Sequence, residues 1–266
     1  MTEPSERAPS LIDRLLSGQR AGAAALVVAV IALVVSVAPY LTGADFGSRV
    51  RTYLVQNPEV LQEVSQALDQ KAQQEEIANQ RRHADETTAR VAANPALLAI
   101  DAGDPAFGPA DAKVTVIEFF DFRCPGCKAT APEVLRLMQA HPDVRFVFKD
   151  WPILDGPTSG VSHHAARAAL AAHQQGRYLP VFQALMAEPA LSPSVIEGIL
   201  RDNGVDLPAA QAAMSGGTVA RLMAGTQTSA MAMQLMGTPT FFVNGKALES
   251  IQPAALDRAI REAKAG

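Results

Sequence analysis

The stretch that decides the fold is Val114-Thr-Val-Ile-Glu-Phe-Phe-Asp-Phe122, followed by Arg123 and then by Cys124-Pro-Gly-Cys127. β-Branched and aromatic residues dominate its first nine positions, which predicts a strand buried on both faces. Apolar residues at helical spacing follow Cys127, and β-formers return from Val144 to Phe148. The order is therefore strand, Cys-x-x-Cys, helix, strand. In that context a Cys-x-x-Cys motif indicates redox chemistry in preference to metal binding.

The two cysteines of the motif are the only ones in the chain. We expect Cys124 at the helix N-cap and Pro125 at the first helical position, where a fixed φ and a missing N–H are harmless. Free amide N–H groups of the first turn and the helix dipole then stabilise a thiolate at Cys124. This predicts that Cys124 is the attacking sulfur and Cys127, one turn deeper, the resolving thiol. The two sulfurs can close a small disulfide ring and reopen it through a mixed disulfide.

Two alternatives exist for this cysteine pair. A zinc site would need two of the five histidines, none of which has standard zinc spacing: His83, His141, His163, His164 and His173. A purely structural disulfide would restrain the unfolded chain little, because its loop is so short. We therefore expect no metal and no cofactor other than a redox-active disulfide between Cys124 and Cys127.

The C-terminal part of the chain predicts a strand, a hairpin turn and a helix. Met236-Gly-Thr-Pro-Thr-Phe-Phe-Val243 joins a turn to an apolar strand, and Asn244-Gly245 is a hairpin signal. A proline that leads into a buried strand removes a hydrogen-bond donor, so Pro239 should occupy an edge, a bulge or a cis bond. A helix is expected from Pro253 to Ala265.

Residues 21–38 form an unbroken run of small and aliphatic residues. At about 1.5 Å per residue such a helix spans roughly the hydrocarbon core of a bilayer, which predicts a transmembrane signal anchor over 21–40 behind a cytoplasmic leader, 1–20. A cleaved signal peptide is the alternative, although its apolar region is usually shorter, about 7 to 15 residues. The anchor would place the rest of the chain in the periplasm, a compartment that permits disulfides.

Residues 41–100 are rich in Gln, Glu, Arg and Ala and predict a helical stalk. Asn57-Pro58 is typical of a helix start, and Asn94-Pro95 of a helix end. A narrow apolar stripe along Val60, Leu61, Val64 and Leu68 allows two interpretations, a solvated spacer or an oligomerisation element. Residues 101–112, rich in Gly, Pro and Asp, are expected to be a linker.

Composition bounds the remaining possibilities. The 266 residues are 48% hydrophobic and 19% charged with a net charge of −4, so neither a disordered chain nor a multi-span membrane protein fits the whole. This charge also gives no electrostatic reason to expect nucleic acid as a partner.

Residues 113–266 resemble the thioredoxin-fold thiol-disulfide oxidoreductases of the bacterial envelope, in particular the DsbA-like family. The resemblance rests on the predicted strand, Cys124-Pro-Gly-Cys127, Glu118 and Gly237-Thr-Pro-Thr240. It implies an α/β fold with an inserted helical domain over about 159–236, which would lie over the active site and shape an apolar groove. Helical patterns over 164–175, 178–187, 193–203 and 219–236 are expected to form this insertion.

The resemblance also implies roles for individual residues. Pro239 would be a cis-proline facing the active-site disulfide, and the backbone of Thr238 and Pro239 would receive an extended substrate segment. Glu118 would be a buried acid with a raised pKa that helps to move the proton of Cys127; a solvated residue at the strand end is the alternative. Relatives that are strong oxidants often carry His where this chain has Gly126, so we expect a less oxidising disulfide here.

The leading hypothesis is a membrane-anchored periplasmic enzyme that forms or rearranges disulfides in unfolded, exported proteins and is reset by an inner-membrane redox partner. The long helix before the catalytic body resembles the ScsC-like proteins, which suggests an oligomeric isomerase or reductase as the alternative. A binding protein for copper or for unfolded chains is the rival class.

The remaining methionine and histidine candidates are expected to have structural roles. We expect packing roles for Met223, Met231, Met233 and Met236, and surface or capping roles for His163-His164.

Overall fold

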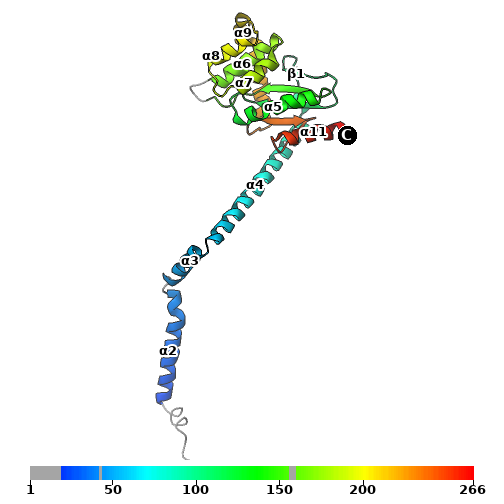
Figure 1. The fold of residues 1–266 in the computed structure, drawn as a ribbon. Helices are drawn as coiled ribbons and strands as arrows, with labels where there is room; N and C mark the ends of the chain where they lie inside the picture. The colour runs from blue at the N-terminus through cyan, green and yellow to red at the C-terminus, as the bar shows by residue number, and fades with distance from the viewer. Residues whose placement is uncertain (1–18, 42–43, 156–159) are drawn as a thin grey trace, which may run out of the picture. The chain divides into compact units, whose positions relative to one another are not determined.

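The structure is a computed structural model that describes residues 19–41, 44–155 and 160–266 (Figure 1). The chain divides into two compact units, residues 1–73 and residues 74–266. The predicted stalk boundary at residue 100 therefore differs from the structure, in which the second unit begins inside the stalk helix.

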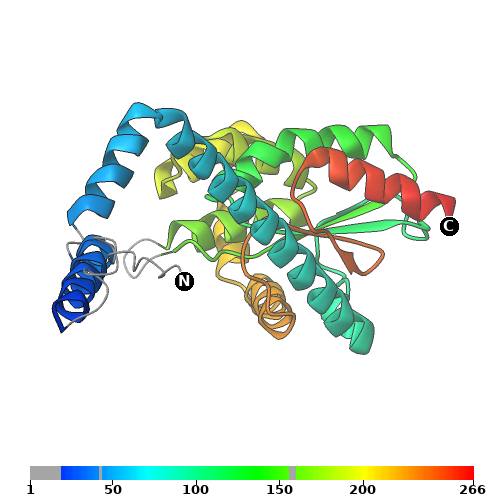
Figure 2. The ribbon, with the colours of Figure 1, turned by 90° about the horizontal axis from the view of Figure 1, so that it is seen from below.

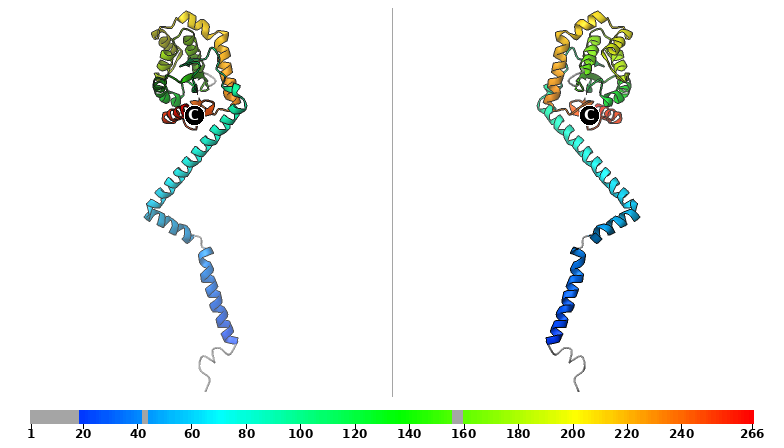
Figure 3. Two further views of the ribbon diagram at one scale, coloured as in Figure 1. Left: turned by 90° about the vertical axis from the view of Figure 1, so that its right-hand side faces the viewer. Right: turned by 90° about the vertical axis from the view of Figure 1, so that its left-hand side faces the viewer.

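The first unit is helical. It holds α2 (Gln19–Leu41), α3 (Ala44–Gln56) and the first part of α4 (Pro58–Ala93), which Figure 3 traces from blue to cyan. The predicted start of α4 at Asn57-Pro58 and its end at Asn94-Pro95 are confirmed. In α2 the side chains are described for residues 22–38, and all of them are exposed. Among the described residues, no helix combines the length and apolar character that a membrane span requires, so the signal anchor stays a prediction.

The second unit is built on a mixed sheet. Within the described residues the sheet has five strands in the order β1-β3-β2-β4-β5. The strands are β1 (Ala106–Phe107), β2 (Thr115–Phe120), β3 (Arg145–Asp150), β4 (Thr240–Val243) and β5 (Lys246–Ala247). The central pair β2 and β3 is parallel, and the other pairs are antiparallel. The predicted burial of β2 on both faces is confirmed, because Val116 to Phe120 are all buried.

Two helices cover one face of this sheet. Helix α5 (Pro125–Ala140) follows β2, and α11 (Pro253–Ala265) closes the chain; the two lie side by side in Figure 2, in green and red. Val134 and Leu137 of α5 share a buried cluster with Leu256 and Ile260 of α11. The predicted hairpin turn is confirmed: Asn244 and Gly245 both have positive φ, and the turn joins β4 to β5.

The predicted linker over 101–112 is wrong in part, because it contains strand β1. Ala106 pairs with Val147 and Phe107 with Phe146, and Asp104 is buried. Two strand residues among glycines and prolines carry no recognisable periodicity. Their pairing depends on the neighbouring strand β3, which sequence reasoning could not supply.

The predicted helical insertion is present as α6 (Val161–Gln174), α7 (Tyr178–Ala187), α8 (Pro193–Asp202), α9 (Leu207–Met214) and α10 (Gly217–Ala232). Helix α9 was not predicted, and α10 ends earlier than expected. Ser192 and Asp206 cap α8 and α9 by accepting hydrogen bonds from Val195 N and Ala209 N.

An aromatic cluster joins the insertion to the sheet. Phe182 of α7 contacts Phe120 of β2 and Phe148 of β3, with ring centroids 5.3 and 4.9 Å apart. Phe122 and Tyr178 complete the cluster. All five rings are buried, so sheet and insertion share one hydrophobic core.

The C-terminal part of α4 packs against the other face and edge of the sheet. Ala84, Thr87 and Val91 are buried, and Val91 belongs to a cluster on the sheet face opposite to α5 and α11. Thr88 Oγ1 accepts a hydrogen bond from Ala247 N at 3.0 Å, which pairs a donor of edge strand β5. Arg90 also donates to Gln234, at 2.7 Å. This end of the predicted stalk is therefore part of the second unit.

Candidate active site

The site begins at the connection between the end of β2 and the start of α5. Cys124 is the N-cap of α5 with extended φ and ψ of −69° and 123°, and Pro125 occupies the first turn, as predicted. Cys124 is 9% exposed and Cys127 is fully buried, and both are free thiols. The sulfur at position 124 therefore lies next to unpaired amide N–H groups of the helix, and the second sulfur lies inside the protein.

The segment before β4 reaches the same place. The peptide bond between Thr238 and Pro239 is cis, as the resemblance implied. Cys124 Sγ lies 3.1 Å from Thr238 O, to which it donates a hydrogen bond when it is protonated. A Cβ added to Gly126 would lie 3.2 Å from Pro239 Cδ and 3.7 Å from Cys124 Sγ. Glycine at 126 thus permits a close approach between the start of α5 and the cis-proline.

The environment separates the two thiols electrostatically. A hydrogen bond from Cys127 lowers the pKa of Cys124 to about 5, against the opposing effect of burial. Contacts with Thr238 and with the N–H groups of Cys127 and Gly126 act in the same direction. Burial, followed by the neighbouring Cys124 and Glu118, raises the pKa of Cys127 far above its ordinary value. At neutral pH the outer sulfur is therefore a thiolate and the inner one a thiol.

Glu118 lies under the cysteines in the centre of the sheet. It is 2% exposed, and neither carboxyl oxygen has a hydrogen-bond partner among the described residues. Burial, with a smaller contribution from Asp150, raises its pKa to about 8. The expectation of a buried acid with a raised pKa holds, whereas a solvated residue at the strand end does not.

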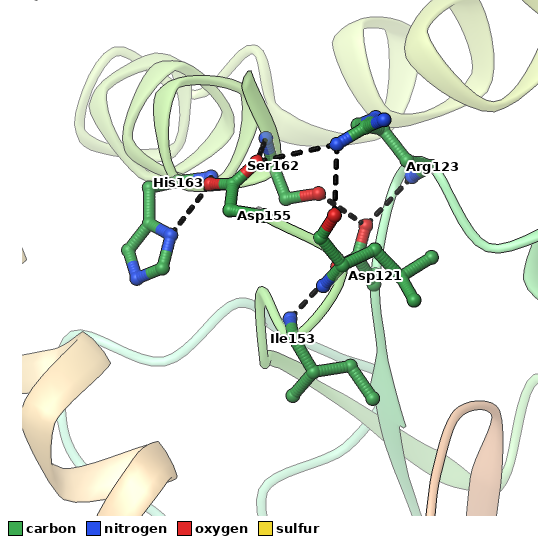
Figure 4. Close-up of polar contacts among 7 residues, drawn as sticks. Asp121, Arg123, Ile153, Asp155, Ser162 and His163 are labelled. Atoms are coloured by element: carbon green, nitrogen blue, oxygen red, sulfur yellow. Dashed lines mark hydrogen bonds and ion pairs between the residues drawn. The ribbon is translucent and has the colours of Figure 1, made fainter. Parts of the chain in front are cut away.

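Sequence reasoning missed a polar network beside Cys124 (Figure 4). Asp121, at the end of β2, accepts hydrogen bonds from the N–H groups of Arg123, Ile153 and Leu154 and from Ser162 Oγ, at 2.7 to 2.9 Å. A second carboxylate, Asp155, accepts from the backbone N–H groups of Ser162 and His163 at the start of α6. The network fixes the backbone just before Cys124 and ties it to residues 153–155 and to the start of α6. An acid directly after a buried strand was the available signal.

The groove differs from expectation, whereas the remaining candidates agree with it in part. An apolar pocket of about 110 Å³ adjoins Pro239, but α4 and the β4–β5 region line it, and α6 to α10 contribute none of its lining residues. Met233 is buried, whereas Met231 and Met236 are exposed. His163 Nδ1 contacts Asp155 at 2.7 Å from a half-exposed side chain, a surface role of the expected kind. Among the described residues, no group of three or more His, Cys, Asp or Glu side chains could hold a metal ion.

The strand order, the cis-proline loop and the helical insertion define the second unit as a thioredoxin-like fold. The family model described as thioredoxin matches residues 100–262, and the chain belongs to this family. A second model, the N-terminal domain of copper resistance protein ScsC, matches residues 44–75. The predicted resemblance to DsbA-like and ScsC-like thiol-disulfide oxidoreductases is thereby confirmed.

Solved structures agree with this assignment. A thioredoxin-like oxidoreductase from Silicibacter pomeroyi DSS-3 is 34% identical, with 65% of this chain and 99% of that chain covered and a TM-score of 0.59. BcfH from Salmonella enterica Typhimurium is 30% identical over 89% of this chain and 99% of that chain, with a TM-score of 0.58. A linker-deletion mutant of ScsC from Proteus mirabilis, with 22% sequence identity and a TM-score of 0.59, supports the fold.

Curated relatives include the Na(+)/H(+) antiporter NhaA 1 of Salinispora arenicola, which is 33% identical over 161 residues, or 60% of this chain. The match covers 24% of that protein, so the chain spans about a quarter of the length of this relative.

Proposed function

We propose that this thioredoxin-like oxidoreductase catalyses thiol-disulfide exchange in client proteins, with Cys124 as the attacking sulfur and Cys127 as the resolving sulfur. One observation carries the proposal: the Cys124 thiolate is stabilised at the start of α5 and lies 3.1 Å from the backbone of the cis-proline loop. The thiolate is the nucleophile in disulfide exchange, and a thiolate beside backbone groups meets its substrate where main-chain pairing can hold it.

The exchange proceeds in two steps. In the reducing direction, Cys124 attacks one sulfur of a client disulfide, the client S–S bond breaks, the other client sulfur leaves as a thiolate, and a mixed disulfide forms. Cys127 then attacks Cys124, the client sulfur leaves, and the Cys124–Cys127 disulfide closes. In the oxidising direction the same steps run backwards. Buried Cys127 must exchange a proton in either direction, and Glu118 is the group we propose for this transfer.

The client segment binds in extended form beside Thr238 and Pro239. Backbone hydrogen bonds are indifferent to client sequence, which suits an enzyme that acts on many unfolded proteins. Met236, which is 83% exposed, and exposed Ile251 lie on the segments that flank the cis-proline and offer adaptable apolar contact.

Activity assays with Cys124→Ala test the proposal. Reduced, denatured ribonuclease measures oxidation, scrambled ribonuclease measures isomerisation, and the variant is expected to lose both activities. Cys127→Ala should accumulate mixed disulfides with clients instead, because the resolving thiol is missing. Full activity in Cys124→Ala would refute the assignment. The equilibrium of the cysteine pair with glutathione then ranks the protein between oxidant and reductant.

We further propose that residues 21–38 hold the protein in the inner membrane, with the catalytic unit in the periplasm and an inner-membrane protein as redox partner. The exposed apolar side chains between Leu26 and Val37 support this. The two native cysteines provide the test, since a membrane-impermeant maleimide should label Cys124 in intact spheroplasts once a membrane-impermeant reductant has opened the Cys124–Cys127 disulfide. Labelling only after lysis would contradict the proposed orientation.

The stalk is proposed to associate with further copies of itself. Leu61, Val64 and Leu68 are exposed on α4, within the segment that matches the ScsC N-terminal domain. Leu61→Asp combined with Leu68→Asp is expected to lower the molar mass measured by sedimentation equilibrium. Gln62→Asp, an exposed control in the same helix, should leave it unchanged. Equal monomer masses for wild type and both variants would favour the spacer interpretation.

A copper-binding role is the second candidate, because the model that matches residues 44–75 is described as part of a copper resistance protein. Stoichiometric copper retained after dialysis, together with a lack of exchange activity, would favour this role over catalysis.

A further inference from the structure

Four acidic side chains are buried among the described residues: Asp104, Glu118, Asp121 and Asp150. A buried carboxylate requires a cation or several donors to remain charged. Asp104 pairs with Lys149 and accepts a hydrogen bond from Asp101 N. Asp121 accepts four hydrogen bonds. Both of these acids are therefore satisfied as carboxylates.

Glu118 and Asp150 are not satisfied in this way. Asp150 Oδ2 accepts one hydrogen bond, from Tyr178 OH at 3.1 Å. Within the described part of the chain, Asp150 Oδ1 and both oxygens of Glu118 have no partner. The nearest lysine in the sequence, Lys149, is engaged by Asp104. One donor for four buried oxygens cannot support two negative charges.

The two acids lie on one face of the sheet. Strands β2 and β3 are parallel, with Glu118 opposite Phe148 and Phe120 opposite Asp150. Side chains alternate along a strand, so these four residues share a face. Phe120 and Phe148 belong to the same buried cluster as Cys127, which places both acids on the side of the resolving cysteine.

Charge effects link Asp150, Glu118 and Cys127. After burial itself, the charge of Asp150 is what raises the pKa of Glu118. The charge of Glu118 contributes in turn to the raised pKa of Cys127, after burial and Cys124. Burial raises the pKa of Asp150 well above its ordinary value, and the hydrogen bond from Tyr178 opposes that rise because it favours the carboxylate. The other titratable groups that act on Asp150 are Asp104 and Asp121, and both have partners of their own.

We propose that Glu118 and Asp150 form one proton-holding pair, in which Tyr178 keeps the negative charge on Asp150 and leaves the proton on Glu118 for delivery to Cys127. The proposal rests on the proposed exchange activity and adds to it a second acid. Asp150 is a positioning residue, because it acts on the reacting sulfur only through Glu118. Interacting acids of this kind titrate as a unit.

The pair acts when a client is oxidised. A client thiolate attacks Cys124, the new disulfide forms between client and Cys124, and the bond between Cys124 and Cys127 breaks. Cys127 receives the electron pair and takes the proton of Glu118, so that it leaves as a thiol, and Glu118 regains a proton from solvent. The client sulfur is oxidised and Cys127 is reduced. A buried thiolate at Cys127, which burial disfavours, is never formed.

The pH dependence of this step tests the pair. Attack of glutathione on the oxidised protein is followed by the fluorescence of Trp151, the only tryptophan. Corrected for the thiolate fraction of glutathione, the wild-type rate constant should fall as pH rises through about 8, where Glu118 loses its proton. Asp150→Asn should move this fall to lower pH by about one unit, because a nearby like charge is removed. Asp143→Asn, an exposed control, should not move it.

A double-mutant cycle shows whether Asp150 acts through Glu118. Glu118→Gln should abolish the fall in rate, and Asp150→Asn should add no shift in that background. An unchanged midpoint in Asp150→Asn, or a shift that persists without Glu118, would overturn the proposal. Absence of any reaction in the wild type would instead refute the proposed function.

Infrared difference spectroscopy examines the pair without relying on activity. At neutral pH the wild type should show one protonated buried carboxyl, whose band moves when glutamate is labelled with 13C. In Tyr178→Phe the band should become sensitive to 13C-labelled aspartate, because the donor to Asp150 is lost. The shared proton would be refuted if Glu118 and Asp150 were both carboxylates, or both protonated, at neutral pH.

Discussion

The thiolate of Cys124 should depend most strongly on Cys127. The pKa of Cys124 falls from 9.0 to about 5 through four hydrogen bonds that together outweigh burial, and the bond from Cys127 is the largest. Because the net fall is about four pH units after burial has acted against it, the four contacts average more than one unit each. We therefore expect Cys127→Ala to raise the pKa of Cys124 from about 5 to above 6.

Alkylation by iodoacetamide between pH 3 and pH 10 measures this shift, with the pH limits set at roughly the range in which thiols titrate. Cys127→Ala carries a single cysteine, so the rate reports Cys124 alone. The matched variant Cys127→Ser keeps a hydroxyl donor in place of the thiol and should retain a lower midpoint than Cys127→Ala. Equal midpoints in the two variants, or a midpoint near 5 in Cys127→Ala, would refute the assignment of the largest contribution to Cys127.

Three further expectations follow from the same contacts. Gly126→Ala brings a Cβ within 3.2 Å of the cis-proline ring and should slow exchange, whereas Gly237→Ala meets no atom within 4 Å and should not; equal rates in steady-state assays would contradict the close approach. Asp121→Asn replaces an acceptor oxygen with a donor amide inside its network and should lower the free energy of unfolding by about 2 to 4 kcal/mol in urea titrations; a loss below about 0.5 kcal/mol would be contrary evidence. Because the folded-state pKa of Cys124 is depressed, reduced wild type should gain stability over Cys124→Ala as pH rises from about 5 to 9 and lose that advantage as pH falls through 5; a difference that does not vary with pH would disagree.

The local features of the site were predictable because local chemistry determines them. Cys124 and Pro125 occupy helix-start positions by their own geometry, and Asn244-Gly245 encodes its turn without help from the rest of the chain. The burial of Glu118 followed from its position inside an apolar strand. In each of these cases the signal and its structural consequence lie within a few residues of one another.

The features that were missed depend on distant partners. The buried residues of α4 are Ala84, Thr87 and Val91, which are small or have no apolar neighbours at helical spacing. They form no apolar stripe that would predict the packing of this end of the helix on the sheet. Asp121 lies within the 114–127 stretch that predicts the fold, but three of its four hydrogen-bond donors come from residues 153–162. Pairing over such separations is a property of the assembled fold, and a single sequence does not display it.

The edge-to-face and tilted packing of the rings of Phe120, Phe148 and Phe182 has a consequence for client selection in the proposed function. These aromatic side chains pack the inserted helices against the strands. Moving the insertion away from the sheet would therefore disrupt the hydrophobic core. Heating should accordingly melt both parts in a single cooperative transition. In the proposed function a client is then accepted by a rigid surface, and discrimination among clients falls to the few side chains that border the cysteine.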